Sequence, residues 1–249
     1  MIRNLLIIMG VGLVLAVVGL GGAFAVGGPA VMKDGWNWSF IDDNGDWVRV
    51  SHDGQGEGAE DGPDVTRSLT WTGGTRLMVD APADVIFTQG DTPSVTVTGP
   101  QSQVERLRLE DGRLSLSPGA GFGAWRRSLK VVITAPNVSD FEINGSQDVS
   151  LRGLDLPRLS VSVSGSGEVD AAGRARTVDV DVSGSGEVDM TALEVTDADV
   201  SISGSGDVQV GPTGAATVAI SGSGDVGLTR RPASVQTRVS GSGDVNERW

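Results

Sequence analysis

The second half of the chain alternates apolar and polar residues with a period of two. From Val161 to Ala171, apolar side chains occupy every second position on both sides of a Ser-Gly-Ser-Gly segment. The same pattern returns from Val178 to Met190 and from Val200 to Val210. Such alternation is typical of a β-strand that buries one face, and the region lacks the sustained 3.6-residue apolar period of a helix. We therefore predict that it consists of strands.

The alternating segments belong to a repeat of nearly constant length. Five Ser-Gly-Ser-Gly motifs, preceded by one divergent Asn-Gly-Ser-Gln copy, align without gaps. Their first glycines are 20, 19, 20, 18 and 19 residues apart: Gly145, Gly165, Gly184, Gly204, Gly222 and Gly241. A fixed period of this size indicates a solenoid in which each repeat is one coil. The glycines permit a sharp corner, and ~19 residues at ~3.3 Å each give a perimeter of at most ~60 Å, which suits a flattened or triangular tube.

These features predict an all-β protein whose residues 141–249 form a parallel β-solenoid, a β-helix-like fold. Stacked coils bury a continuous ladder of aliphatic side chains, whereas one coil alone buries too little to offset the entropy of ordering its backbone. The residues expected to point inward are Val180, Val182, Val188, Ile202, Val208, Ile220 and Val226.

Residues 65–140 are strand-like but do not repeat. Asp111 and Gly112 form the favoured pair for a tight hairpin turn. We expect an irregular N-terminal β section that begins and caps the solenoid, because an uncovered terminal coil would expose an open strand edge. The predicted strands are Arg76–Val79, Val85–Gln89, Ser94–Thr98, Leu107–Glu110, Arg113–Ser117 and Leu129–Thr134.

Residues 1–32 are predicted to be an N-terminal transmembrane or signal helix. The run from Leu5 to Val26 contains no charged residue, and the uncharged stretch continues to Met32, which is long enough to cross a bilayer. The small residues from Ala23 to Ala25 equally fit a signal-peptide cleavage site. Both alternatives export the rest of the chain, because Arg3 favours a cytoplasmic N-terminus. We expect either an inner-membrane-anchored protein facing the periplasm or, after cleavage, a protein exported to the periplasm or cell surface.

Residues 33–64 are rich in glycine and acidic side chains, which predicts a flexible linker. Trp47 to Val50 is the one short piece within it for which an ordered structure is expected. The whole chain has a net charge of −13, which argues against nucleic-acid binding. It contains no cysteine, which excludes disulfides and thiolate metal sites, and its single histidine, His52, lies in this linker.

Two groups of residues are candidates for binding. One acid follows each corner motif, and in a solenoid these acids stack at about 4.8 Å and repel one another. Asp and Glu interchange in this row, so we expect no specific metal site. If divalent cations bind weakly, the candidates are Glu168, Glu187, Asp207, Asp225 and Asp244, with Asp148 in the divergent copy. The second group is a candidate interaction loop in which glycine, aromatic and arginine residues converge: Phe122, Trp125, Arg126 and Arg127.

The chain resembles bacterial envelope proteins of the family named "putative auto-transporter adhesin, head GIN domain". The resemblance covers Leu77 to Val245 and rests on three features: the segment Ala83–Asp91, the segment Gly112–Leu116 and the serial corner motifs. It implies a β-helix-like solenoid, and the family name implies adhesion. We expect a non-catalytic adhesion, interaction or structural module without cofactors, with an unknown protein or glycan as partner and the membrane as a second partner through the N-terminal helix.

The alternative is a carbohydrate-active β-helix enzyme. Such enzymes need a groove with carboxylates and aromatic platforms for sugar rings. Between Glu142 and Arg248 the sequence contains no Trp, Phe, Tyr, His or Lys. A sugar site would therefore belong in the irregular section, near Phe87 and the candidate interaction loop.

Overall fold

The computed structural model describes residues 36–41, 47–52, 63–117 and 129–248, which divide into two compact units at Glu60 and Asp61. The first unit contains an antiparallel hairpin of β1 (Trp36–Ile41) and β2 (Trp47–His52). This hairpin lies within the predicted linker, and the predicted ordered piece Trp47–Val50 falls inside β2. Segment 1–32 lies outside the described residues, and no helix among those described is long and apolar enough to cross a membrane.

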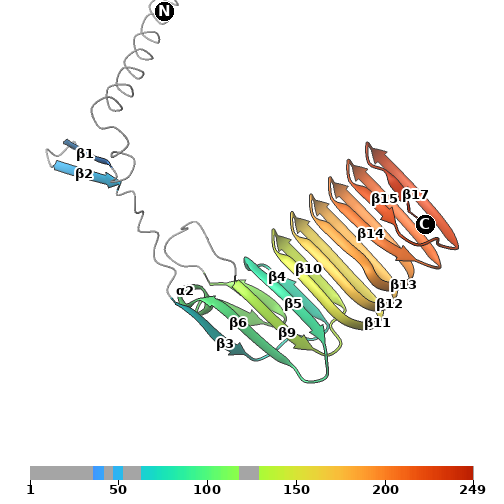
Figure 1. Cartoon of the computed structure of the whole chain (residues 1–249), viewed down its shortest axis with the longest axis horizontal. Coiled ribbons are helices and arrows are strands. Elements are labelled where there is room, and N and C mark those ends of the chain that lie inside the picture. Colours follow the sequence, from blue (N-terminus) through green and yellow to red (C-terminus); the bar gives the residue numbers. More distant parts are fainter. Residues whose placement is uncertain (1–35, 42–46, 53–62, 118–128, 249) are drawn as a thin grey trace, which may run out of the picture. The chain divides into compact units, whose positions relative to one another are not determined.

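The second unit is a parallel β-solenoid of about five turns, as predicted (Figure 1). In each coil, one strand leads into the glycine corner and the next leads away from it. We call the strands that lead into the corners the first sheet: β4 (Arg76–Val79), β10 (Asp140–Gly145), the C-terminal parts of β11 (Asp148–Gly165), β12 (Glu168–Gly184) and β13 (Glu187–Gly204), then β15 (Ala215–Gly222) and β17 (Ser234–Gly241). We call those that lead away the second sheet: β5 (Ala83–Gln89), the N-terminal parts of β11, β12 and β13, then β14 (Asp207–Pro212), β16 (Asp225–Leu228) and β18 (Val245–Glu247).

A short third side joins the second sheet back to the first sheet. It is formed where Leu154–Leu156 of β11 pairs with Gly173–Ala175 of β12. The ladder shifts register just before this side, between Leu151 and Leu154, and such irregularities bend a strand. Each long strand therefore runs from the second sheet across the third side into the first sheet.

The interior of the tube is filled with aliphatic side chains. All seven residues predicted to point inward are at most 2 % exposed, which confirms the assignment. They stack in rows along the axis, because Val180, Val200 and Val218 occupy corresponding positions on successive strands. Two larger side chains, Phe87 and Phe141, pack edge to face at 5.0 Å between ring centroids near the start of the solenoid.

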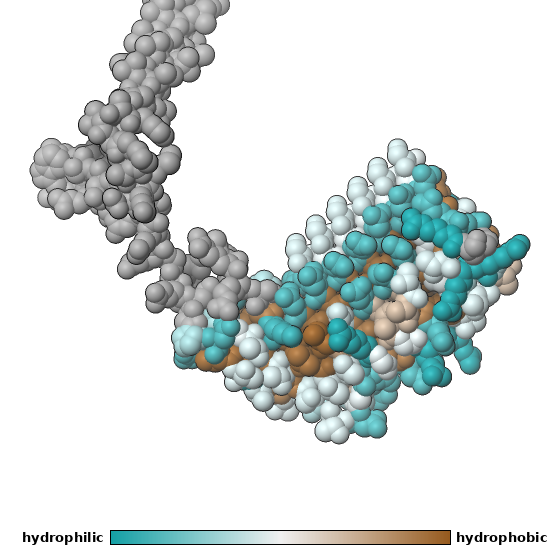
Figure 2. Space-filling model, in the orientation of Figure 1, coloured by the Kyte–Doolittle hydropathy of each residue, from teal (hydrophilic) through white to brown (hydrophobic). Residues whose placement is uncertain are grey.

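The corners are built from backbone packed against backbone. The first glycine of each motif has a positive φ, for example 127° at Gly184, where other residues are strained. A Cβ atom at Gly184 would overlap the carbonyl oxygen of Gly165 in the coil below. Ser185 N donates a hydrogen bond of 2.8 Å to that same oxygen. Figure 2 shows these serine and glycine corners as a row of pale projections along the upper edge.

The N-terminal section continues both sheets past the first coil and ends each of them in an antiparallel pair of strands. All six predicted strands are present within two residues of their predicted limits. The Asp111-Gly112 turn is also confirmed, with φ values of 49° and 78°. The second sheet is extended by β9 (Leu129–Ala135), β6 (Ser94–Pro100) and β3 (Asp64–Leu69), and the first sheet by the hairpin of β8 (Arg113–Leu116) and β7 (Leu107–Glu110). A four-residue helix, α2 (Gln101–Val104), follows β6 and buries Val104.

Candidate functional site

The corner acids form an exposed row along the second sheet. Glu168 pairs with Asp148 on one side and with Glu187 on the other, and the row continues through Asp207 and Asp225. Two of the aspartates accept backbone hydrogen bonds from the next coil: Asp207 Oδ1 from Asp225 N at 3.1 Å, and Asp225 Oδ1 from Asp244 N at 2.8 Å. These aspartates therefore help to hold successive corners together.

A second pair of acids, Asp170 and Asp189, lies two residues further along the same strands. Partial burial raises the pKa of Glu168, and the negative charges of Asp170, Glu187, Asp148 and Asp189 raise it further. Glu168 is thus at the centre of the acidic patch. Among the described residues, no group of three or more His, Cys, Asp or Glu side chains has an arrangement that could hold a metal ion. Our expectation that cations bind only weakly to this row stays a prediction.

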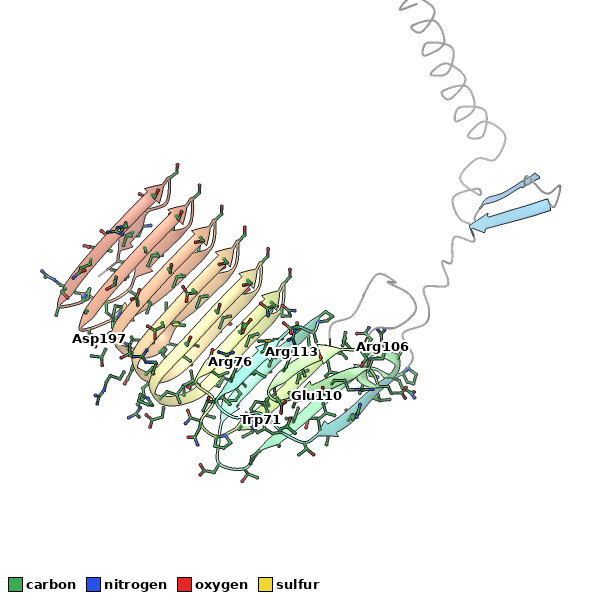
Figure 3. All side chains as sticks on the ribbon, turned by 180° about the vertical axis from the view of Figure 1, so that it is seen from behind. Trp71, Arg76, Arg106, Glu110, Arg113 and Asp197 are labelled. Atoms are coloured by element: carbon green, nitrogen blue, oxygen red, sulfur yellow. The ribbon has the colours of Figure 1, made fainter. Side chains whose placement is uncertain are left out.

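The charged residues at the start of the solenoid have structural partners. Arg76 pairs with Asp140 at 2.8 Å, and this hydrogen-bonded pair raises the pKa of Arg76. Arg113 pairs with Asp80, which also accepts a hydrogen bond of 2.6 Å from Asn144 Nδ2. Figure 3 places Arg76 and Arg113 close together, on the neighbouring strands β4 and β8. These contacts hold β4, β8 and β10 together at the start of the solenoid.

The aromatic residues predicted for a sugar site do not form one among the described residues. Phe87 is fully buried against Phe141, so it offers no platform at the surface. The candidate interaction loop of Phe122, Trp125, Arg126 and Arg127 lies outside the described residues, and its role stays a prediction.

A groove of about 540 Å³ runs along the third side of the solenoid. Five successive coils contribute to it, and the buried side chains of Leu156, Ala175 and Val195 form its floor. Its charged lining residues are exposed and carry both signs: Asp155, Arg174, Arg176, Glu194 and Arg230.

Three arginines line this groove, and two of them are available for a ligand. Arg174 forms an ion pair, in which its Nε lies 3.9 Å from Asp155 Oδ1. Arg176 and Arg230 form no ion pair with another described residue. We call Arg174, Arg176 and Arg230 the groove arginines.

The charges of the regular coils are divided between their sides. Residues 141–248 contain eight arginines, and four of them lie on the segments of the third side: Arg174, Arg176, Arg230 and Arg231. Arg152 lies beside Thr88 of the second sheet, and Arg158 forms an ion pair of 3.3 Å with Asp179 of the first sheet. The segments of the third side carry two acids, namely Asp155 and Glu194, while Asp197 stands at the register position of Arg158, where the first sheet begins. Figure 3 shows Asp197 at the lower edge of the solenoid, away from the corners. The third side is therefore net positive in a protein whose two sheets are acidic outside.

This arrangement suits binding by charge better than catalysis. Three guanidinium groups above an apolar floor can hold carboxylate, sulfate or phosphate groups of an extended ligand. The groove's two acids, Asp155 and Glu194, are both exposed, so they lack the desolvated setting that is typical of a catalytic acid.

The groove arginines were not among the candidates found in the sequence. They lie in the segments between one alternating run and the next, to which the period-two pattern assigns no role. A usable signal was present, because the arginines of the repeat region cluster between the apolar runs and avoid the corners. Recognising that Arg230 lies beside Arg174 required the stacking of the coils.

The fold of this unit is a parallel β-solenoid, and no catalytic function is indicated for it. Residues 75–232 match the family described as "Putative auto-transporter adhesin, head GIN domain". The chain belongs to that family, as its resemblance implied. The family description is that of an exported or surface protein. The last corner motif lies beyond the matched range but forms a further coil of the same kind.

A solved structure shows the same fold. The chain is similar to a "putative adhesin" from Bacteroides fragilis NCTC 9343, with 18 % identity and a TM-score of 0.62, over 74 % of this chain and 97 % of that one. It is also similar to a "putative adhesin" from Parabacteroides distasonis ATCC 8503, with 19 % identity and a TM-score of 0.48, over 75 % and 98 % of the two chains. At these identities the likeness concerns the fold alone. No curated protein matches the sequence.

The family description names an adhesin and no enzyme. The carbohydrate-active enzyme that we kept as an alternative is therefore not supported.

Proposed function

We propose that this protein is a non-catalytic binding module of the bacterial cell envelope, and that the groove on its third side binds an anionic polysaccharide. The observation that carries the proposal is the separation of charge: four of the eight arginines of residues 141–248 lie on the third side, against two acids there, in a solenoid that is otherwise acidic.

An extended ligand fits the shape of the groove. The groove follows the solenoid axis across five coils, and the groove arginines come from different coils along its length. Adjacent coils are about 4.8 Å apart, which is close to the length of one sugar residue. A polymer with one carboxylate per sugar can therefore meet several arginines at once, and each such contact is a charge-assisted hydrogen bond.

Anionic rather than neutral sugars are favoured by the groove's composition. Its lining contains no aromatic ring on which a pyranose could stack. Affinity must then come from charge, so it should fall with added salt, because exposed charges are screened over about 8–10 Å at physiological ionic strength. The acidic sheets repel the same ligand and confine it to the third side.

Binding of the full-length protein to polygalacturonate, with neutral dextran as the comparison, tests this function. We expect saturable binding to polygalacturonate that weakens at least about tenfold between low and moderate salt, and no binding to dextran. The triple variant Arg174→Ala, Arg176→Ala, Arg230→Ala should lose that binding. A control variant removes three exposed cations outside the groove: Lys130→Ala, Arg238→Ala and Arg248→Ala. Equal loss in both variants would show that only net charge matters and would contradict a groove site.

We further propose that residues 1–32 keep the protein in the inner membrane, with the solenoid in the periplasm. The uncharged run from Arg3 to Lys33 is long enough to remain as an anchor. Mass spectrometry of the mature protein should find the N-terminal segment intact. A mature chain that begins at Val26 would instead show a cleaved signal and a protein released into its compartment.

A further inference from the structure

The last strand of the first sheet is exposed on its outer edge. β17 pairs with β15, and no other described strand pairs with it (Figure 1). All eight of its residues are exposed. Val235 and Val239 are 37 % and 44 % exposed, although they continue the rows of Ala216 and Ile220, which are buried. The apolar interior of the solenoid is thus open at this end.

The backbone of the same strand presents unused hydrogen-bonding groups. The N–H groups of Ser234 and Ser242 point back to the carbonyl oxygens of Gly214 and Gly222. Successive residues of an extended strand direct these groups to opposite edges, so Val235, Thr237 and Val239 direct theirs outward. The residues with outward backbone groups are therefore also those with inward side chains.

We propose that a second copy of this chain covers β17, and that the two β17 strands pair antiparallel about a twofold axis at Thr237. In this register Thr237 faces its own counterpart, and Val235 faces Val239 of the other copy twice. Each facing pair is hydrogen-bonded, which gives about six main-chain bonds across the axis. The pairing closes the open interior with cross-strand valine pairs on the face where apolar contact is needed.

The outward side chains agree with this register. Gln236 faces Arg238 of the other copy, so an amide oxygen meets a guanidinium on each side of the axis. Shifting the strands by two residues in one direction places Arg238 opposite Arg238, which is repulsive. Shifting them in the other direction places Val239 opposite Ala233 and removes both valine pairs. The sequence of β17 thus favours one self-complementary register.

The N-terminal end of the solenoid differs from the β17 end, so the proposed assembly stops at two copies. There the sheets end in antiparallel strands, with α2 beside β3 and β6. A twofold interface between identical edges uses up both edges, so the product is a dimer rather than a fibre. One strand edge per copy is a small interface, so the dimer should depend on protein concentration.

Cysteine cross-linking of the full-length protein in detergent tests the proposal. The chain has no cysteine of its own, so each variant carries a single thiol. In a hydrogen-bonded antiparallel pair the facing Cα atoms are about 5.5 Å apart, within the disulfide range of about 4.4–6.8 Å. Thr237→Cys should therefore form disulfide-linked dimers under mild oxidation. Thr237 is exposed, so its replacement should leave the fold unchanged.

Gln236→Cys is the matched control, because it is the adjacent and equally exposed position. In the proposed register the two copies of residue 236 are diagonal neighbours, about 7–8 Å apart and beyond disulfide reach. We expect cross-linking at least about tenfold slower than for Thr237→Cys. Association through residues 1–32 would raise both rates alike. Adding Val239→Lys to the Thr237→Cys chain should lower its rate to that of the control. Equal rates for the two cysteine variants, or a rate that Val239→Lys leaves unchanged, would overturn the proposal.

Discussion

The corner glycines are the residues on which stacking depends most directly. At each corner the backbone of one coil touches the backbone of the next, and a hydrogen bond such as that from Ser205 N to Gly184 O fixes the contact. No side chain fits between the two. Five consecutive corner glycines meet the same obstacle, because a Cβ at each would overlap the corner glycine of the coil below: Gly165, Gly184, Gly204, Gly222 and Gly241.

Gly184→Ala should therefore destabilise the protein strongly. The strained φ alone costs about 1–3 kcal/mol, and the overlap with Gly165 O adds to it. The free energy of unfolding, measured by denaturant titration, should fall by at least that amount. Gly74→Ala is the control, because a Cβ at Gly74 has no neighbour within 4 Å. Similar losses in the two variants would show that the corner contact is not the cause.

The raised pKa of Glu168 makes a prediction about pH. An acid whose pKa is raised in the folded state binds protons more tightly there than in the unfolded chain. Its contribution to stability is present below the unfolded pKa of about 4.5 and is lost as pH rises through the folded value. Glu168→Gln should thus raise the melting temperature at pH 7 and have little effect near pH 4. The control is Asp91→Asn, which likewise removes one negative charge but lies in an exposed turn outside the corner row.

At the scale of elements, the period-two pattern was sufficient to predict the strands. Every predicted strand is present. One face of each strand lies against the aliphatic interior, and this produces the alternation of apolar and polar residues in the sequence. The hairpin of β1 and β2 was not predicted, since its many acidic neighbours suggested a linker. The pair Asn44-Gly45 between the two strands was an available hairpin signal. The four-residue helix α2 is too short to show a helical period.

The groove could not be predicted in the same way. Its floor follows from the alternation, but its lining combines charged residues from the third-side segments of five coils, and these residues have no common spacing in the sequence. The acids of the corner row were easier to find, because they recur at each repeat. Regular features of a solenoid are thus readable from its sequence, whereas a site that crosses irregular positions appears only when the coils are stacked.

Ile202→Asp tests the inward face of β13. Ile202 is 1 % exposed and stacks between Val182 and Ile220. A carboxylate there has no partner, so it should destabilise the protein by more than about 4 kcal/mol and abolish cooperative unfolding. Ser203→Asp, on the exposed face of the same strand, should melt close to the native protein in circular dichroism. Normal melting of Ile202→Asp would refute the inward assignment.

At the scale of the whole molecule, charge is the dominant surface property. The net charge is −13, and the row of corner acids runs the length of the regular coils. Self-repulsion of this kind lowers the stability of the folded state, and dissolved ions reduce it by screening.

The melting temperature should therefore rise with salt of any kind. We expect sodium chloride and calcium chloride, compared at equal ionic strength, to stabilise the full-length protein to nearly the same extent. A tight calcium site needs several oxygens at about 2.3–2.6 Å from the ion, which one carboxylate per coil does not supply. Thermal unfolding in a chelator, in sodium chloride and in millimolar calcium checks this. A large rise with calcium alone would identify the acidic row as a calcium-binding array.

The uniform corners have a consequence for how such a protein can change its size. Since every corner rests on the same backbone atoms of the corner below, removing or duplicating one whole repeat leaves each remaining junction chemically unchanged. The distance between the two ends of the solenoid can then vary in steps of about 4.8 Å, while the N-terminal section and β17 keep their own contacts. Duplication or loss of one repeat in the gene can therefore lengthen or shorten the solenoid by one coil at a time.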